Sequence, residues 1–123
     1  MFRGEVWQMS MGRSGGKEGV SYRTVLIISS DALGALPLKI VVPLTNWKED
    51  YTGVPWMVRL PPVLHSGLES PMAADAIQVR SVSTARLVKR LGELPEKFTD
   101  QIAGAVALVM EGGQPATKNN PPT

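Results

Sequence analysis

Short apolar stretches of strand length fill most of the first three quarters of the chain, and segments rich in glycine, proline and polar residues separate them. In residues 4–11 a tryptophan and two methionines recur at every second position, which predicts a strand with one buried face. Residues 23–29 carry a continuous apolar run, typical of a central strand covered on both faces, and residues 38–45 carry another. Because Pro43 cannot donate a hydrogen bond to a neighbouring strand, we expect it at a sheet edge or a bulge.

Three further strands and one helix complete the predicted elements. The strand candidates are residues 54–60, 73–80 and 87–91. The helix is predicted to begin near Pro95, because proline suits the first helical turn and the following Glu96 suits the positive end of the helix dipole. One face of this helix carries apolar residues at helical spacing: Phe98, Ile102, Ala105 and Val109. The glycine pair at 112–113 is expected to end it.

Five or six short strands followed by one terminal helix predict a mainly β fold. We expect a small twisted antiparallel sheet or partly closed barrel, with the helix over its open side. A short helical turn capped by Ser30 or Asp31 is expected before Gly34. One domain is expected over residues 1–112. Residues 113–123 hold three prolines and two asparagines without an apolar face, which predicts a disordered tail.

Composition and charge exclude several kinds of site. The chain has 123 residues, a formal net charge of +2, no cysteine and a single histidine, His65. Disulfides, thiolate-bound zinc and a two-histidine ribonuclease mechanism are therefore excluded. No apolar run approaches the roughly 20 residues that a membrane helix needs, so we expect a cytoplasmic protein without membrane association. The small positive charge permits nucleic-acid binding but does not argue for it.

Six short fragments, taken in order along residues 3–111, carry a resemblance to a known family. They are RGEVW at residues 3–7, YRTVLIIS at 22–29, SDAL at 30–33, VVPLT at 41–45, GL at 67–68 and IQVRSV at 77–82. In this order and spacing they resemble the motifs of the MazF/PemK toxins, the mRNA interferases of type II toxin–antitoxin systems. Each fragment is weak alone, and the resemblance depends on their order over almost the whole chain.

The resemblance implies a fold, an activity and partners. The fold is the SH3-like small barrel shared with the CcdB gyrase poisons. The activity is sequence-specific cleavage of single-stranded RNA without metal or cofactor, in which the 2′-hydroxyl attacks the adjacent phosphate and leaves 2′,3′-cyclic phosphate and 5′-hydroxyl ends. The working form is a homodimer in the bacterial cytoplasm. Its protein partner is a small MazE-like antitoxin whose flexible tail blocks the active groove, and DNA is contacted only through that antitoxin.

The resemblance places Arg23 and Thr45 at the reacting phosphate. Arg23 carries planar donors suited to phosphate and stands where a glycine-rich loop, residues 12–21, enters an apolar strand. Its position alone fits a solvated arginine equally well. The Thr45 hydroxyl could donate to a phosphate oxygen, although threonine is also simply favoured in strands. Since the pKa of arginine exceeds about 12, stabilisation of negative charge is the role we expect for Arg23, not proton donation.

The chain departs from the family pattern at the position of the general base. The family usually carries an acid directly before the glutamine of its fifth strand, where this chain has Ile77. Asp75 lies two residues earlier and shares a strand face with Ile77 if the strand is regular. Glu18, in the glycine-rich loop, is a second candidate because family members often carry an acid there. Either carboxylate could equally be a solvated surface charge.

Four further residues are candidates for RNA binding: Trp47, Gln78, Arg80 and Arg86. Trp47 follows a strand and offers a surface on which a base can stack, whereas Trp56 is placed in a strand and is expected in the core. Alternation predicts Gln78 and Arg80 on the face opposite Asp75, where they would bind RNA or support the dimer.

Two other functions remain possible on the sequence alone. A non-catalytic binder on the same fold, similar to a gyrase poison or a degenerate toxin, is kept open by the loss of the acid at Ile77. The presence of Arg23 and Thr45 favours the endoribonuclease. A simple RNA-binding module leaves the order of the six fragments unexplained.

Overall fold

The computed structural model describes residues 1–12 and 19–112. The centre of the glycine-rich loop, with the candidate base Glu18, and the expected disordered tail at residues 113–123 lie outside this range. No helix in the described part of the chain is long and apolar enough to cross a membrane.

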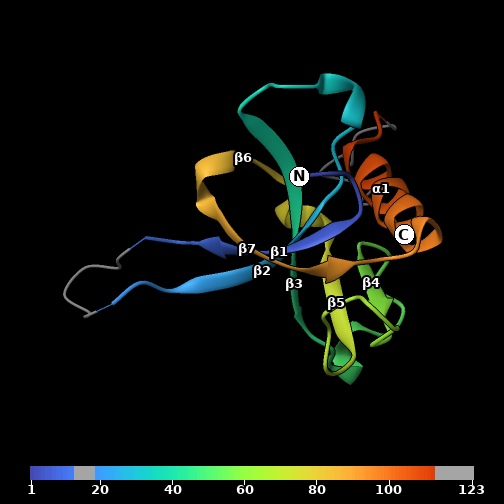
Figure 1. The fold of residues 1–123 in the computed structure, drawn as a ribbon. Helices are drawn as coiled ribbons and strands as arrows, with labels where there is room; N and C mark the ends of the chain where they lie inside the picture. Colours follow the sequence, from blue (N-terminus) through green and yellow to red (C-terminus); the bar gives the residue numbers. More distant parts are fainter. Residues whose placement is uncertain (13–18, 113–123) are drawn as a thin grey trace.

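The described residues form one antiparallel sheet of seven strands and a terminal helix (Figure 1). The strands are β1 (Glu5–Ser10), β2 (Tyr22–Ile27), β3 (Leu38–Asn46), β4 (Met57–Leu60), β5 (Met72–Asp75), β6 (Arg80–Ser83) and β7 (Leu87–Glu93). Four single 3₁₀ turns, η1 (Asp31–Leu33), η2 (Glu49–Tyr51), η3 (Ala76–Gln78) and η4 (Thr84–Arg86), precede the helix α1 (Glu96–Met110). The strand order is β4-β5-β3-β2-β1-β7, with β6 also paired to β3. The mainly β prediction with a C-terminal helix is therefore confirmed.

Two apolar clusters lie on the two faces of the sheet. Leu26 and Val42 belong to the cluster that α1 closes with Ile102 and Ala105. The neighbouring Val25 belongs to the second cluster, with residues from β1, β3, β6 and β7. Adjacent residues of β2 thus enter different clusters, as the alternation of a strand requires. This confirms the prediction that β2 is a central strand covered on both faces, and that α1 covers an open side of the sheet.

Pro43 lies in the middle of the sheet, so the prediction that it marks an edge or a bulge is wrong. It is fully buried and opposite Val25 of β2. The carbonyl of Ile40 accepts a hydrogen bond from the amide of Ile28, just after β2, so even-numbered residues of β3 point their backbone N–H and C=O groups toward β2. Odd-numbered residues, Pro43 among them, point these groups toward the opposite edge of β3. On that edge β6 pairs with residues 38–41 and β5 with residues 44–46. Pro43 falls in the gap between these two strands, where no amide donor is needed.

The strand predicted over residues 73–80 is two strands with a turn between them. β5 ends at Asp75, whose carboxylate accepts from the amide of Ile77 and so caps η3. The strand predicted over 54–60 begins only at Met57, because a series of turns occupies the preceding residues. Trp56 stands in these turns and is 40% exposed, which corrects its expected place in the core. The predicted cap at Ser30 is confirmed, since its hydroxyl accepts from the amide of Ala32.

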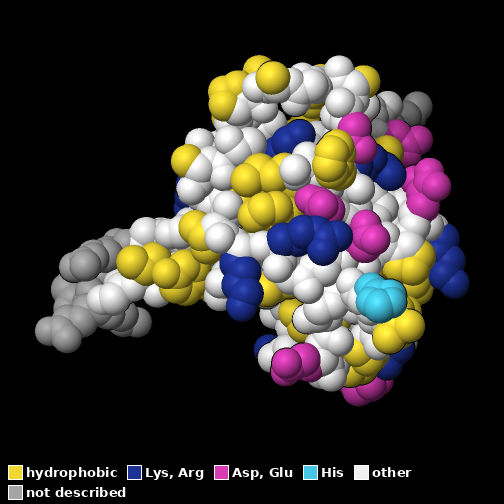
Figure 2. Space-filling model, viewed as in Figure 1, with side chains coloured by type: hydrophobic (Ala, Val, Ile, Leu, Met, Phe, Trp, Pro, Cys, Tyr) yellow, Lys and Arg dark blue, Asp and Glu magenta, His cyan; other side chains and the backbone are white. Residues whose placement is uncertain are grey.

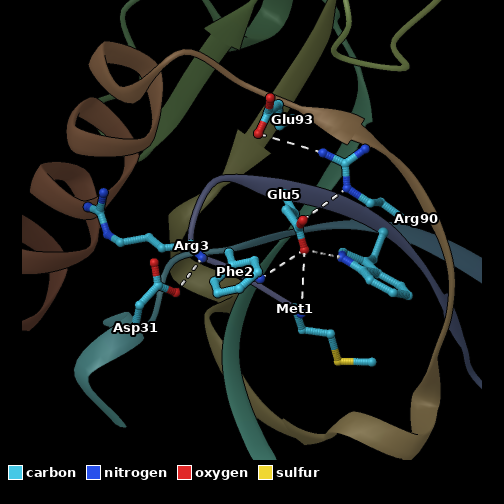
Figure 3. A network of polar contacts seen from close by, with 8 residues as sticks. Met1, Phe2, Arg3, Glu5, Asp31, Arg90 and Glu93 are labelled. Atoms are coloured by element: carbon cyan, nitrogen blue, oxygen red, sulfur yellow. Dashed lines mark hydrogen bonds and ion pairs between the residues drawn. The ribbon is translucent and has the colours of Figure 1, made fainter. Parts of the chain in front are cut away.

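The first residues of the chain are held in place by the side chains of Glu5 and Arg3, and Figure 3 shows the contacts of Glu5. The buried carboxylate of Glu5 accepts hydrogen bonds from the Phe2 amide at 2.8 Å, the Trp7 indole at 3.1 Å and the Arg90 guanidinium at 2.9 Å. Arg3 donates to the carbonyl of Ile28 and forms an ion pair with Asp100 of α1. The fragment at residues 3–7 therefore joins β1 to β7 and to the helix.

These contacts change the pKa of Glu5. Burial, the largest single influence, raises the pKa, but the hydrogen bonds from Phe2, Arg90 and Trp7 and the nearby N-terminal ammonium together outweigh it and hold the pKa below its ordinary value. The native state therefore binds the Glu5 proton more weakly than the unfolded chain does. The stability that the Glu5 carboxylate contributes is complete above the unfolded pKa of about 4.3 and is lost as the pH falls through the lowered folded value.

Replacing Glu5→Gln should lower the free energy of unfolding near neutral pH by about 2 kcal/mol, because three donors lose a charged acceptor. Urea unfolding between pH 3 and 7 measures this loss, which should shrink at the acidic end. Glu93→Gln is the matched control: Glu93 also pairs with Arg90, but its side chain is 65% exposed. It should change stability by less than about 0.5 kcal/mol. Equal losses in the two variants would contradict the assignment.

Candidate active site

Arg23 and Thr45 lie on one face of the sheet, at adjoining ends of β2 and β3. Arg23 pairs with Met9 of β1, and two residues later Val25 pairs with Pro43 of β3. Alternation along each strand then puts Arg23 on the face of Val25, and Thr45 on the face of Pro43. Both side chains are half-buried. The structure therefore places the two residues expected at the reacting phosphate on the same surface.

A chain of hydrogen bonds connects Arg23 to the carboxylate of Asp75. The Arg23 guanidinium donates to Gln78 Oε1 at 3.1 Å, and Gln78 Nε2 donates to Asp75 Oδ2 at 2.8 Å. The amide of Ile77 donates to the other oxygen, Asp75 Oδ1, at 3.2 Å. The side-chain amide of Gln78 is thus oriented by its two charged neighbours, because its oxygen faces the cation and its nitrogen faces the anion.

This arrangement corrects the predicted positions of Gln78 and Ile77. A regular strand would place Gln78 opposite Asp75, and Ile77 beside it. The turn η3 interrupts the strand after Asp75, so the side chain of Gln78 returns to that carboxylate. Ile77 instead lies on the surface, 57% exposed. Of the two candidate bases, Asp75 is therefore brought to Arg23, whereas Glu18 lies outside the described residues.

Trp47 is half-buried just after β3 and carries two neighbours that the sequence analysis missed. The Arg59 guanidinium carbon lies over the indole, 5.6 Å from its centroid, and the ring of Tyr51 meets it edge-on at 5.7 Å. Arg59 is paired with Ala73, and Ala73 with Thr45, so these three residues share a face. A charged residue between the apolar Val58 and Leu60 was the available signal for an outward-facing position.

Arg80 and Arg86 have different surroundings. Arg80 is exposed and lies opposite Val41 of β3, so it is on the same face as Thr45. Val41 and Thr45 are four residues apart, which separates Arg80 from Thr45 by about 13 Å along the strand direction. Arg86 is half-buried, and its Nε donates to the carbonyl of Ser10 at 3.0 Å. Arg86 thereby fastens the end of β1. Contact of either arginine with RNA stays a prediction. His65 lies apart from these residues, in an exposed turn with a φ of 65°.

The side chains around Arg23 define what the site can do chemically. Within residues 1–12 and 19–112, no three acidic or histidine side chains gather as a set of metal ligands. The groups present are a guanidinium, a hydroxyl, an amide and a carboxylate, contributed by Arg23, Thr45, Gln78 and Asp75. The guanidinium and hydroxyl can donate to a phosphate, and the carboxylate can take a proton from a substrate hydroxyl.

A small antiparallel β protein with a C-terminal helix and this polar surface has the architecture of a toxin class. Comparison with known families matches residues 2–110 to the PemK-like, MazF-like toxins of type II toxin–antitoxin systems. The chain belongs to this family.

Individual relatives agree with this membership. The chain is 30% identical to the endoribonuclease MazF9 of Mycobacterium tuberculosis over 118 residues, which cover 90% of this chain and 97% of that protein. It is 29% identical to the endoribonuclease PemK of Escherichia coli, over 89% of this chain and 82% of that protein. Among solved structures, a MazE–MazF complex from Deinococcus radiodurans is similar in fold, with a TM-score of 0.72, 23% identity, and coverage of 89% and 95% of the two chains.

Proposed function

We propose that the chain is the toxin of a type II toxin–antitoxin system and acts as a sequence-specific endoribonuclease on single-stranded RNA. The observation that carries the proposal is the hydrogen-bonded chain from Arg23 through Gln78 to Asp75, on the face that also bears Thr45. In a non-catalytic binder the Asp75 carboxylate would serve only as the cap of η3, and its connection to Arg23 through Gln78 would have no role. Membership of the toxin family supports the same conclusion.

RNA supplies its own nucleophile for the reaction. A base removes the proton of a 2′-hydroxyl, the 2′ oxygen forms a bond to the adjacent phosphorus, and the bond from phosphorus to the 5′ oxygen breaks. The departing oxygen takes up a proton, which leaves 2′,3′-cyclic phosphate and 5′-hydroxyl ends. Negative charge on the phosphate oxygens rises as the new bond forms. Arg23 and Thr45 donate to these oxygens, and one such preorganised donor is worth roughly 3–4 kcal/mol.

Asp75 is the base that the geometry favours. Its carboxylate is linked to Arg23 through a single side chain, so a phosphate bound at Arg23 lies near an oxygen that can accept a proton. Each of its oxygens accepts one hydrogen bond and keeps a lone pair for the 2′-hydroxyl. Gln78 fixes the spacing between the cation and the base, which makes it a positioning residue.

A second copy of the chain and a small antitoxin are the partners that we propose, in the bacterial cytoplasm. A shallow apolar groove of about 450 Å³ lies between α1 and the sheet, lined by residues that include Ile28, Ile40, Val79, Val106 and Met110. Ile40 is 40% exposed and Met110 is 72% exposed. In Figure 2, hydrophobic side chains also gather over η1 and the segment that leads into β3. Burial of such a surface favours a homodimer. The antitoxin would then block the site of each protomer.

Removing the phosphate donors should abolish most cleavage. Arg23→Ala and Thr45→Val are each expected to lower the rate about 10²–10³-fold, measured on a long single-stranded RNA, while the circular dichroism spectrum is unchanged. Thr24→Val is the matched control, because Thr24 neighbours Arg23 in β2 but points to the other face. It should cleave normally. Normal cleavage by Arg23→Ala would refute the site.

The two candidate bases can be separated by isosteric variants. Asp75→Asn keeps the cap of η3 but cannot take a proton, so we expect a loss of at least about 100-fold in the single-turnover rate. Because Asp75 takes the proton in this proposal, Glu18→Gln should cleave within about twofold of the wild type. The reverse pattern would assign proton transfer to Glu18 instead.

The proposed homodimer can be disrupted at one position. Ile40→Glu should shift the protein from dimer to monomer in sedimentation equilibrium, because a charge placed in the apolar groove must be desolvated on association. Leu64→Glu is the control: Leu64 is 82% exposed but lines no part of that groove. It should leave the association unchanged. If Leu64→Glu dissociates the dimer and Ile40→Glu does not, the interface lies at Leu64 and not at the apolar groove.

A further inference from the structure

Arg59 is a cation on the face that bears the candidate site, and none of the ion pairs in the described part of the chain includes it. Its guanidinium lies over the indole of Trp47, and the indole is in turn held edge-on by Tyr51. Among the described residues, no hydrogen bond or ion pair to the Arg59 side chain is formed. Stacking on an aromatic ring attracts a guanidinium and restricts its movement, but leaves its N–H groups without acceptors. Such a fork is preorganised for a ligand that has two acceptors side by side.

The register of three strands fixes the distance of Arg59 from the proposed phosphate position. Thr45 in β3 is opposite Ala73 in β5, and Ala73 is opposite Arg59 in β4. Two strand spacings separate Thr45 from Arg59, which is about 10 Å between their backbones. Ala73, between them, carries only a methyl group and is itself fully buried, so the path from Thr45 to Arg59 runs over the side chains that cover it. A nucleotide next to the one at Thr45 would therefore come within reach of the long Arg59 side chain.

We propose that Arg59 is a specificity-determining residue, which reads a guanine next to the scissile phosphate through O6 and N7. This inference rests on the proposed ribonuclease function and adds to it the identity of a base. Guanine presents two adjacent acceptors, O6 and N7, to the two donors of the guanidinium. Adenine presents the acceptor N7 beside the donor N6–H₂, so it cannot accept both hydrogen bonds. Trp47 then acts as the support of Arg59. In this proposal the base meets the guanidinium and not the indole face that Arg59 covers, so recognition by Arg59 takes the place of direct stacking of RNA on that face of Trp47.

The test is cleavage of an RNA library with random positions, followed by sequencing of the cut sites. Wild-type protein should favour guanine at one position close to the cut. Arg59→Ala should reduce that preference about tenfold or more and leave preferences at other positions unchanged. Arg59→Lys keeps the charge but lacks the planar fork, and it should lose the guanine preference as well. Lys97→Ala is the matched control, because Lys97 is another cation over an aromatic ring, that of Phe98 in α1, and its removal changes the net charge equally.

The outcomes separate this inference from the proposed function. If wild-type protein cuts no RNA, the proposed function fails. If wild-type protein cuts and Arg59→Ala keeps the same guanine preference, only the role of Arg59 fails. A uniform loss of cleavage at all sequences, with preferences intact, would make Arg59 a phosphate contact and would likewise overturn the inference. Retention of the guanine preference by Arg59→Lys would also contradict recognition by the fork.

Discussion

The difference in length between β3 and its outer neighbours is the constraint on which the site depends. β3 has nine residues, whereas β5 and β6 have four each and share its outer edge. The chain must pass from one neighbour to the other along that edge, and it does so through the turn η3. The turn brings Gln78 back to Asp75 and within reach of Arg23. A continuous strand would have sent Gln78 to the opposite face, and no polar chain would form.

The two faces of the sheet differ in what they contribute: both bear an apolar cluster, but only one also bears the candidate site. The helix α1 covers one face and closes the larger apolar cluster. The other face has its own cluster around Met9 and Val25, and polar residues extend from its edge. Arg3 and Glu5 belong to the first of the six sequence fragments, and their contacts connect the N-terminal strand to β7 and α1. The contacts of that fragment are therefore structural, while the residues that we propose for the chemistry lie in β2, in β3, at the end of β5 and in η3.

Apolar periodicity predicted most of the fold, because buried strands and a helix face must repeat at fixed intervals. It could not predict the turn η3, because residues 73–80 alternate as a strand would. The strand is interrupted because β5 and β6 pair with different parts of the same edge of β3. For the same reason it misplaced Gln78. Pro43 was misjudged because a missing N–H matters only on the edge to which it would point, and on that edge of β3 neither β5 nor β6 pairs with position 43. The contact of Arg59 with Trp47 joins residues twelve positions apart in different elements, and no local pattern encodes it.

The central claim is that the polar surface at Arg23 uses the 2′-hydroxyl of RNA as the nucleophile. The most direct measurement is the chemical identity of the ends produced when purified protein cuts a defined RNA in the presence of EDTA, determined by mass spectrometry. The account predicts 2′,3′-cyclic phosphate on one fragment and a 5′-hydroxyl on the other. Fragments with 3′-hydroxyl and 5′-phosphate ends, or RNA left intact at high protein concentration, would contradict it.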